Sequence, residues 1–454
     1  MQCLHSSNFV SDKKRHLIRT FFVWLIREIT GGVFLFSGFV KAIDPWGTIY
    51  KFNEYFAAMG LEIWPSLVVV GVFGLSAVEF TVGLFLMCGC FRVSTPRTGL
   101  LFMFVMLPLT LWVAWKDPVA DCGCFGDALI ISNWATFWKN VVLTAMFLYL
   151  IRYNKVCRCL ISPQLQWLAC VTCGAYILGI SLYGFLVQPM IDFRGYPVNS
   201  LFPGEEVETG DDETSSMIFT YEKNGVKKEF TDVDSLPSAD DGWVFVERRT
   251  LPSVTVKNYP APTTEDKSFR IWSEDGEEDI TEDIIDTDSR YFLLLLPDLK
   301  NLSIASSWRI NSLRDWCEQH DIEMIGITGG SREEIEEWKD LAMASYPIYV
   351  ADDTSIKELA RGNPAIVYLD KGRIRWKSSL WSIEKDDYLS DGVSGDPMGF
   401  PHDGKTMLRN MTGLFVGIIV VLIALSLMPS FLQRLSSSFS SMSSKLKRKN
   451  NRNI

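Results

Sequence analysis

Histidine is scarce in this sequence, with 4 residues among 454. A site built on histidine ligands or on a histidine base is therefore not expected. The sequence also carries no glycine-rich phosphate-binding loop, no hydrolase triad signature and no metalloprotease motif. These absences argue against nucleotide-dependent, hydrolytic and metalloprotease activities.

Positive charge is also in deficit, because the formal net charge is -10. Most of the excess Asp and Glu falls within about residues 205–290, in a stretch that we interpret as a solvated acidic surface. Such a surface repels the phosphates of nucleic acids and an anionic lipid face. We therefore expect no nucleic-acid partner.

The composition is divided between two kinds of chain. Hydrophobic residues make up 48%, too many for a soluble protein, yet 22% of the residues are charged, too many for a pure membrane bundle. Apolar runs of about 20 residues can each cross a bilayer core about 30 Å thick. Six such runs predict membrane spans at about residues 21–40, 64–87, 98–115, 134–151, 166–187 and 411–429.

Basic residues predict the orientation of these spans, because cytoplasmic segments of membrane proteins are enriched in Lys and Arg. Every basic cluster falls on the side that holds both termini. We therefore expect a multi-pass protein of a bacterial-type inner (plasma) membrane, surrounded by membrane lipid, with both termini cytoplasmic and residues 189–409 extracytoplasmic. The clusters are Lys13, Lys14, Arg15 and Arg19; Arg92 and Arg97; Arg152, Lys155 and Arg158; and Arg434, Lys445, Lys447, Arg448, Lys449 and Arg452.

Two cysteines, Cys122 and Cys124, lie in the loop between the third and fourth predicted spans. Thiols in an exposed loop are usually kept for their reactivity. A disulfide between them would close a small, strained ring, and strained disulfides readily oxidise other thiols. We expect no covalently bound cofactor, with a quinone as electron acceptor. Two alternatives remain open, a structural turn and a metal site that adds Asp121 and Asp127, although we favour no metal.

Charged residues within the predicted spans need a reason, because each is costly in hydrocarbon. Arg27 and Glu79 lie at similar depths from the inner face, so we expect them to pair, with a proton path or contact with a quinone as the alternative. Near the outer face, the side of the cysteine loop, lie Lys41, Asp44, Lys139 and Asn140. A cation close to Cys122 or Cys124 would lower a thiol pKa, whereas snorkelling is the simpler explanation for Lys139.

Three features together resemble the DoxX/MauE family of membrane proteins: the segment 31–45, Glu79 and the Cys-Gly-Cys-Phe-Gly-Asp loop. The resemblance implies a four-helix bundle over residues 21–155, similar to that of vitamin K epoxide reductases, with a role linked to disulfides or quinones. It also implies a likeness to methylamine utilisation proteins. Unlike vitamin K epoxide reductases, this chain has Cys-x-Cys spacing, and its loop 41–63 has no cysteine.

Strand and helix patterns alternate after residue 290, and their order resembles a thioredoxin-like domain over residues 285–385. Pro364 takes the position of the family's cis-proline. No cysteine is present at 302–308, where the family places its Cys-x-x-Cys, so we expect a docking module without dithiol exchange. Cys317 is expected in the core. The inner cysteines fit apolar packing better than a four-thiolate metal site; they are Cys88, Cys90, Cys157, Cys159, Cys170 and Cys173.

These observations predict a multi-domain protein, an α-helical membrane bundle with an extracytoplasmic α/β domain. We expect a thiol/disulfide redox protein linked to a quinone, in which Cys122 and Cys124 oxidise an extracytoplasmic protein client. The alternative is a non-catalytic scaffold or sensor that binds a partner through the thioredoxin-like domain. The predicted segments are a cytoplasmic N-terminus (1–20), the bundle (21–155), a fifth span (160–188), an acidic β-rich segment (189–284), the thioredoxin-like domain (285–385), a tether (386–409), a sixth span (410–430) and a basic, Ser-rich tail (431–454).

Overall fold

A computed structural model describes residues 3–119, 122–154, 159–202, 217–223, 226–230, 244–250, 269–281, 289–383 and 404–450. The chain divides into two compact units, Met1–Ser200 with Arg270–Ile454, and Leu201–Phe269. The first unit contains the long helices and a mixed α/β domain. The second contains a small sheet.

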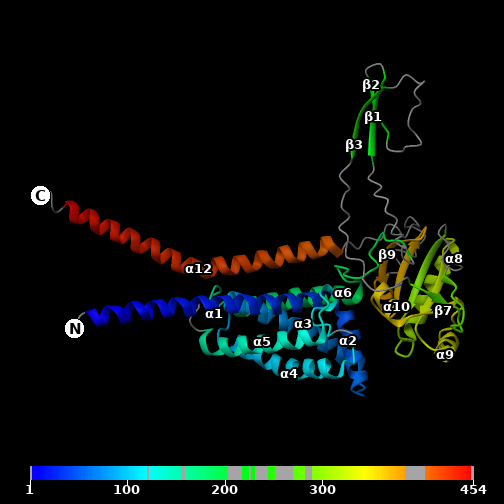
Figure 1. Ribbon diagram of the computed structural model, residues 1–454, viewed down its shortest axis with the longest axis horizontal. Helices are drawn as coiled ribbons and strands as arrows, with labels where there is room; N and C mark the ends of the chain where they lie inside the picture. Colours follow the sequence, from blue (N-terminus) through cyan, green and yellow to red (C-terminus); the bar gives the residue numbers. More distant parts are fainter. Residues whose placement is uncertain are drawn as a thin grey trace. The chain divides into compact units, whose positions relative to one another are not determined.

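Within the residues that the structure describes, six helices are long and apolar enough to cross a membrane, which confirms the predicted number and places of the spans. Four of them, α1, α3, α4 and α5, lie side by side (Figure 1). The chain is thus a multi-pass membrane protein. The helices are α1 (Cys3–Ile43), α3 (Pro65–Cys88), α4 (Ser94–Lys116), α5 (Asn133–Tyr153), α6 (Gln166–Leu186) and α12 (Gly404–Asn450).

Two glycines allow α1 and α3 to pack backbone against backbone. A Cβ on Gly38 would overlap the backbone of Phe80, and one on Gly83 would overlap the backbone of Leu35. Helices in membranes use small residues for such close crossings. This crossing fixes the register of the two helices, and so decides which polar side chains face each other.

The elements beside the candidate site lie at one end of the bundle. Helix α2 (Pro45–Ala58) begins there directly after α1, with the Asp44 carboxylate accepting the Gly47 N–H at 2.9 Å as an N-cap. The indole N–H of Trp46 donates to the carbonyl of Phe185 near the end of α6. The loop between α4 and α5 contains the 3-10 helix η1 (Gly126–Ala128). We name residues 122–128 the Cys loop.

The α/β domain is a sheet of six strands in the order β4-β7-β6-β5-β8-β9. Strand β5 runs parallel to β6 and antiparallel to β8. As predicted, the Asn363–Pro364 peptide bond is cis, and Cys317 is buried in the core. The elements are β4 (Ile271–Trp272), β5 (Arg290–Leu296), α8 (Ala305–Gln319), β6 (Glu323–Thr328), α9 (Arg332–Ala342), β7 (Ile348–Ala351), α10 (Asp353–Leu359), β8 (Ala365–Asp370), β9 (Arg373–Ser379) and η5 (Leu380–Ser382).

The second unit contains an antiparallel sheet in the order β2-β1-β3. Its strands are β1 (Met217–Lys223), β2 (Val226–Phe230) and β3 (Val244–Thr250). The hairpin of β1 and β2 was predicted from Asn224-Gly225, a dipeptide typical of two-residue turns. Strand β3 was not predicted. Most of the expected tether, 386–403, lies outside the described residues.

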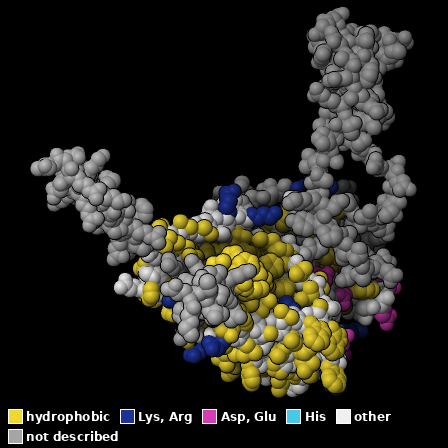
Figure 2. Space-filling view, turned by 60° about the vertical axis from the view of Figure 1, so that its left-hand side comes forward, with side chains coloured by type: hydrophobic (Ala, Val, Ile, Leu, Met, Phe, Trp, Pro, Cys, Tyr) yellow, Lys and Arg dark blue, Asp and Glu magenta, His cyan; other side chains and the backbone are white. Residues whose placement is uncertain are grey.

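The bundle exposes a broad apolar surface. Figure 2 shows hydrophobic side chains over most of the described part of the face in view, with Lys and Arg mainly at its borders. Leu101, Phe104 and Val105 of α4 are among the most exposed apolar residues. An apolar surface of this size on long helices is a lipid-facing surface.

Candidate functional site

The Cys loop folds back into the bundle. The carbonyl of Cys124 accepts hydrogen bonds from Ser37 Oγ at 2.9 Å and from Lys41 Nζ at 2.8 Å. Ser37 lies six residues before the end of α1 at Ile43, or about 9 Å at the helical rise of 1.5 Å per residue. The carbonyl of Cys122 accepts from the hydroxyl of Tyr55 at 2.5 Å. Irregular backbone is tolerated at such depth when the surrounding protein provides donors.

The two thiols lie together inside this site. Their Sγ atoms are 3.2 Å apart, and both cysteines are free thiols. Gly123 supports this turn with φ +60, in the left-handed region that glycine adopts without strain. Cys122 is only 8% exposed and Cys124 is half-buried, so the expectation of solvent-exposed thiols was wrong. The physical reason is that Ser37, Lys41 and Tyr55 bind the loop's carbonyls.

A buried ion pair lies beside the loop. Lys41 Nζ is 2.7 Å from Glu79 Oε2, and each residue is 5% exposed. Lys41 Nζ also donates to Ser37 Oγ at 2.6 Å and to the Cys124 carbonyl, so its three donors are all used. The Ser37 hydroxyl lies 2.8 Å from Glu79 Oε2. A continuous polar chain thus connects Glu79 to the backbone of the Cys loop.

The predicted pairing of Arg27 with Glu79 is wrong. Arg27 donates instead to the carbonyls of Leu86 and Met87, in the last turn of α3. The register of the α1–α3 crossing, with Gly38 against Phe80, explains the difference. It places Lys41 opposite Glu79 and Arg27 at the end of α3.

Lys139 and Asn140 complete the wall of the site on α5. Lys139 Nζ lies 4.1 Å from the centroid of the Phe125 ring, a cation–π contact that holds its charge close to the Cys loop. The Asn140 amide donates to Thr110 Oγ1 at 3.2 Å. Both residues line the same cavity as the thiols.

The surroundings shift the pKa values of the two thiols in opposite directions. The hydrogen bond from Cys122 lowers the pKa of Cys124, and the charges of Lys139 and Lys41 lower it further, against the opposing effects of burial and Glu79. The same hydrogen bond, together with burial, raises the pKa of Cys122. These shifts favour the thiolate at Cys124 and the protonated thiol at Cys122.

The thiols border a small cavity within the bundle. Its volume is about 50 Å³, enough for water but well below the roughly 300–1,000 Å³ of typical ligand pockets. Polar and apolar side chains share its wall, among them Lys41, Tyr55, Phe102, Met106, Lys139 and Asn140. A larger molecule reaches the thiols only if this wall moves.

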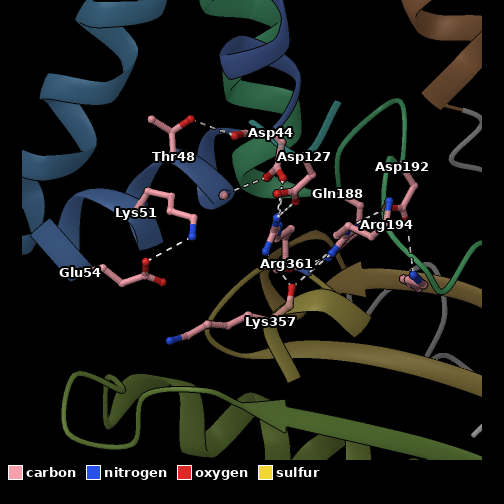
Figure 3. Close-up of polar contacts among 12 residues, drawn as sticks. Asp44, Thr48, Lys51, Glu54, Asp127, Gln188, Asp192, Arg194, Lys357 and Arg361 are labelled. Atoms are coloured by element: carbon pink, nitrogen blue, oxygen red, sulfur yellow. Dashed lines mark hydrogen bonds and ion pairs between the residues drawn. The ribbon is translucent and has the colours of Figure 1, made fainter. Parts of the chain in front are cut away.

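Asp44 and Asp127 are placed differently from the other predicted residues. Both bind Arg361 of the α/β domain, through a 2.8 Å ion pair to Asp44 and a hydrogen bond to Asp127 (Figure 3). Sequence reasoning missed Arg361, and no local signal could have found it, since it is 317 residues from Asp44. Asp121 lies outside the described residues.

The remaining cysteines that the structure describes form no recognisable centre. Cys88, Cys90 and Cys173 are buried, and Cys170 is exposed. Within the described ranges, no group of three or more His, Cys, Asp or Glu side chains is placed to hold a metal ion. Cys157, one of the inner cysteines, lies outside those ranges.

Fold and site together define a class: a multi-pass membrane protein with a separate mixed α/β domain and a pair of thiols within its helices. Residues 19–153 match the family model described as Methylamine utilisation protein MauE, a range that contains both thiols, Lys41, Glu79 and Lys139. Residues 215–252, which include the sheet of the second unit, match a family described as Domain of unknown function (DUF8463). No curated protein matches the chain. The part of the chain that contains α3, α4, α5 and most of α1 is therefore similar to the MauE family.

Proposed function

We propose that this protein is a membrane thiol/disulfide oxidoreductase in which Cys122 and Cys124 cycle between dithiol and disulfide. A quinone accepts the electrons, and an extracytoplasmic protein client supplies them. The observation that carries the proposal is the 3.2 Å separation of the two Sγ atoms beside charged groups inside a lipid-embedded bundle. Thiols kept only for packing need neither this proximity nor two nearby lysines.

The orientation of the protein is part of this proposal. Arg92 and Arg152 lie near the bundle end opposite the Cys loop, where the Asn154 amide donates to the Arg92 carbonyl. If the positive-inside rule holds in a bacterial-type inner membrane, that end is cytoplasmic. The Cys loop and the α/β domain would then be extracytoplasmic, in a compartment where disulfides persist.

The proposed reaction has two halves. A client thiolate attacks Cys122 of the disulfide form, because Cys124 is the better leaving group: its thiolate is stabilised by Lys139 and Lys41. The client's second thiolate then displaces Cys122, which leaves a client disulfide and a reduced pair. In the second half, the pair forms its S–S bond again as two electrons pass to the quinone, which takes the proton of Cys122 and a second proton from the aqueous medium and becomes a quinol.

Charged neighbours serve the proton transfers of this cycle. Glu79, Ser37 and Lys41 form a hydrogen-bonded chain that ends at the Cys124 carbonyl. A peptide carbonyl does not relay protons, so the part of this chain is to hold the ionisable carboxylate of Glu79 near the pair as a proton acceptor. Lys139 and Asn140 line the cavity and could donate hydrogen bonds to a quinone oxygen once the wall opens.

We propose that the α/β domain is a thioredoxin-like domain without the redox-active cysteine pair of that family. Strands β5 and β6 are parallel and joined through α8, and the cis Pro364 precedes β8, which pairs antiparallel with β5. The start of α8 carries serines where the family carries cysteines. We propose that the domain binds a partner and exchanges no electrons.

The proposal is tested on the purified protein in detergent. The reduced protein is mixed with a water-soluble quinone, and remaining thiols are counted with a maleimide reagent after acid quenching. We expect two thiols lost for each quinone reduced, with the loss abolished in Cys122→Ser and in Cys124→Ser. The matched control is Cys170→Ser, since Cys170 is exposed and does not line the cavity beside the thiols. Quinone reduction at the wild-type rate by both serine variants would contradict the proposal.

A non-catalytic scaffold or sensor is the second candidate. It is favoured by the absence of cysteines at the start of α8 and by the docking of Arg361 onto the bundle. It predicts that the double variant Cys122→Ser, Cys124→Ser keeps the phenotype of the gene, whereas deletion of residues 200–400 removes it. The redox proposal predicts that both changes remove it.

A further inference from the structure

We infer that Arg361 is a positioning residue that latches the α/β domain onto the Cys loop and keeps the thiol pair closed until a client displaces it. This inference rests on the proposed function, because it describes the regulation of the same site. Figure 3 shows the side chains of Asp44 and Asp127 converging on Arg361.

The guanidinium of Arg361 is held on every side. Its Nε donates to Asp44 Oδ2 at 2.9 Å, its Nη2 bonds both Asp44 and Asp127, and its Nη1 donates to the Lys357 carbonyl at 2.8 Å. The ring of Tyr50 lies 5.5 Å from its central carbon. Arg361 is only 5% exposed. Such a fully bonded, buried arginine fixes geometry.

These contacts reach the Cys loop from two directions. Asp127 belongs to η1, three residues after Cys124. Asp44 caps α2, and Tyr55 of α2 binds the carbonyl of Cys122. A single side chain of the α/β domain therefore holds the loop directly through η1 and indirectly through α2.

The segment around Arg361 is itself seated on the bundle side. The Gln188 amide donates to the Arg361 carbonyl at 2.5 Å and accepts from the Arg361 N–H at 3.1 Å. The Tyr50 hydroxyl lies 3.4 Å from the carbonyl of Gly362. The cis Pro364 follows two residues later. This chain's own bundle therefore occupies the side of the domain on which the cis-proline loop lies.

Loss of Arg361 would leave two neighbouring carboxylates without their shared cation. Like charges at short range repel, and each would gain by moving into water. Because one carboxylate is on the Cys loop and the other caps α2, their separation opens the loop. We therefore expect the thiols to become accessible when the latch is broken, even without a client.

The test measures the rate at which N-ethylmaleimide alkylates Cys122 and Cys124 in the reduced, detergent-solubilised full chain. We expect Arg361→Gln to raise this rate at least tenfold and Arg361→Lys to raise it less. The control Arg309→Gln removes an arginine of the same domain that contacts Trp381, and it should leave the rate unchanged.

A second variant breaks the latch without changing Arg361. A Cβ on Gly47 would lie 2.6 Å from Asp44 Oδ2 and 2.9 Å from Arg361 Nη2, so Gly47→Ala should also raise the alkylation rate. Its control is Gly71→Ala, where a Cβ meets nothing within 4 Å. If Arg361→Gln and Gly47→Ala, both monodisperse, label at the wild-type rate, the latch is refuted.

The two proposals can fail separately. Alkylation is measured on reduced protein and requires no redox cycle, so faster labelling in a protein that never reduces a quinone would keep the latch and overturn the oxidoreductase. If the protein reduces a quinone but both latch variants are labelled at the wild-type rate, the oxidoreductase proposal is kept and the latch is overturned.

Discussion

Replacing Lys41 by methionine tests the polar chain at the centre of the site. Lys41 Nζ contacts Glu79, Ser37 and the Cys124 carbonyl at 2.6 to 2.8 Å, and the lysine is 5% exposed. Methionine keeps much of the volume and removes every hydrogen bond. The carboxylate of Glu79 would then stay buried with only the Ser37 hydroxyl to solvate it.

Two estimates bound the loss in free energy of unfolding that Lys41→Met should cause. Removing one partner of a buried ion pair costs about 3–5 kcal/mol. Protonating a glutamate at pH 7 instead costs about 3.7 kcal/mol, which sets a ceiling on the contribution of the bare charge. We therefore expect Lys41→Met to lower the free energy of unfolding by about 3 kcal/mol. For a cooperatively unfolding unit of roughly 150–250 residues, the size of the helical bundle, that corresponds to a fall in Tm of roughly 6–12 °C.

The assay is thermal unfolding in detergent, compared across a double-mutant cycle. Lys41→Met combined with Glu79→Gln should recover about 2 kcal/mol of the loss, because no charge is then left buried. Lys139→Met is the control, since Lys139 contacts a ring face and should cost less than about 1 kcal/mol. The reasoning is refuted if Lys41→Met unfolds within 2 °C of the wild type, or if the double variant is no more stable than the single one.

The other predictions concern reactivity and packing. Because the charge of Lys139 helps to lower the pKa of Cys124, the alkylation rate of that thiol, however slow, should reach its plateau at a lower pH than that of an ordinary thiol. Lys139→Gln should raise its pKa and slow alkylation at pH 7 about three- to tenfold; an unchanged pH–rate profile would contradict this. Gly83→Leu should prevent α1 and α3 from packing and abolish monodisperse protein, whereas Gly71→Leu in the same helix should be tolerated. Equal yields of the two variants in size-exclusion chromatography would disprove the crossing.

Local patterns predicted the elements of this fold well. Apolar runs placed all six candidate spans, and Asn224-Gly225 placed the hairpin of β1 and β2. Both signals depend on residues close together in the sequence. The strand order of the larger sheet, with β7 beside β6, depends on distant pairing and was not predicted.

The composition of the site was partly predictable and its pairing was not. Lys41, Glu79, Cys122 and Cys124 were all chosen from the sequence, because charges within apolar runs and closely spaced loop cysteines are unusual. The partner of Glu79 depends on how α1 crosses α3, which Gly38 and Gly83 set by close approach. The depth of residues along their helices, taken alone, therefore led to the wrong prediction that Arg27 pairs with Glu79.

The burial of the thiols was hidden for a similar reason. A loop between two spans is expected in water, and no feature near Cys122 signals that it folds back. The donors that make the inward position favourable are Ser37 and Lys41, more than 80 residues away from Cys124. The role of Asp44 and Asp127 could likewise not be predicted, because both bind Arg361, which is distant in the sequence.

The most direct test of the account is the oxidation state of Cys122 and Cys124 in native membranes. Thiols are blocked with one maleimide under acid quench, disulfides are then reduced and labelled with a second, and the loop peptide is analysed by mass spectrometry. We predict that the pair is mainly disulfide when quinone is plentiful and mainly dithiol when quinone synthesis is blocked. Two cysteines that remain free thiols under both conditions would contradict the account.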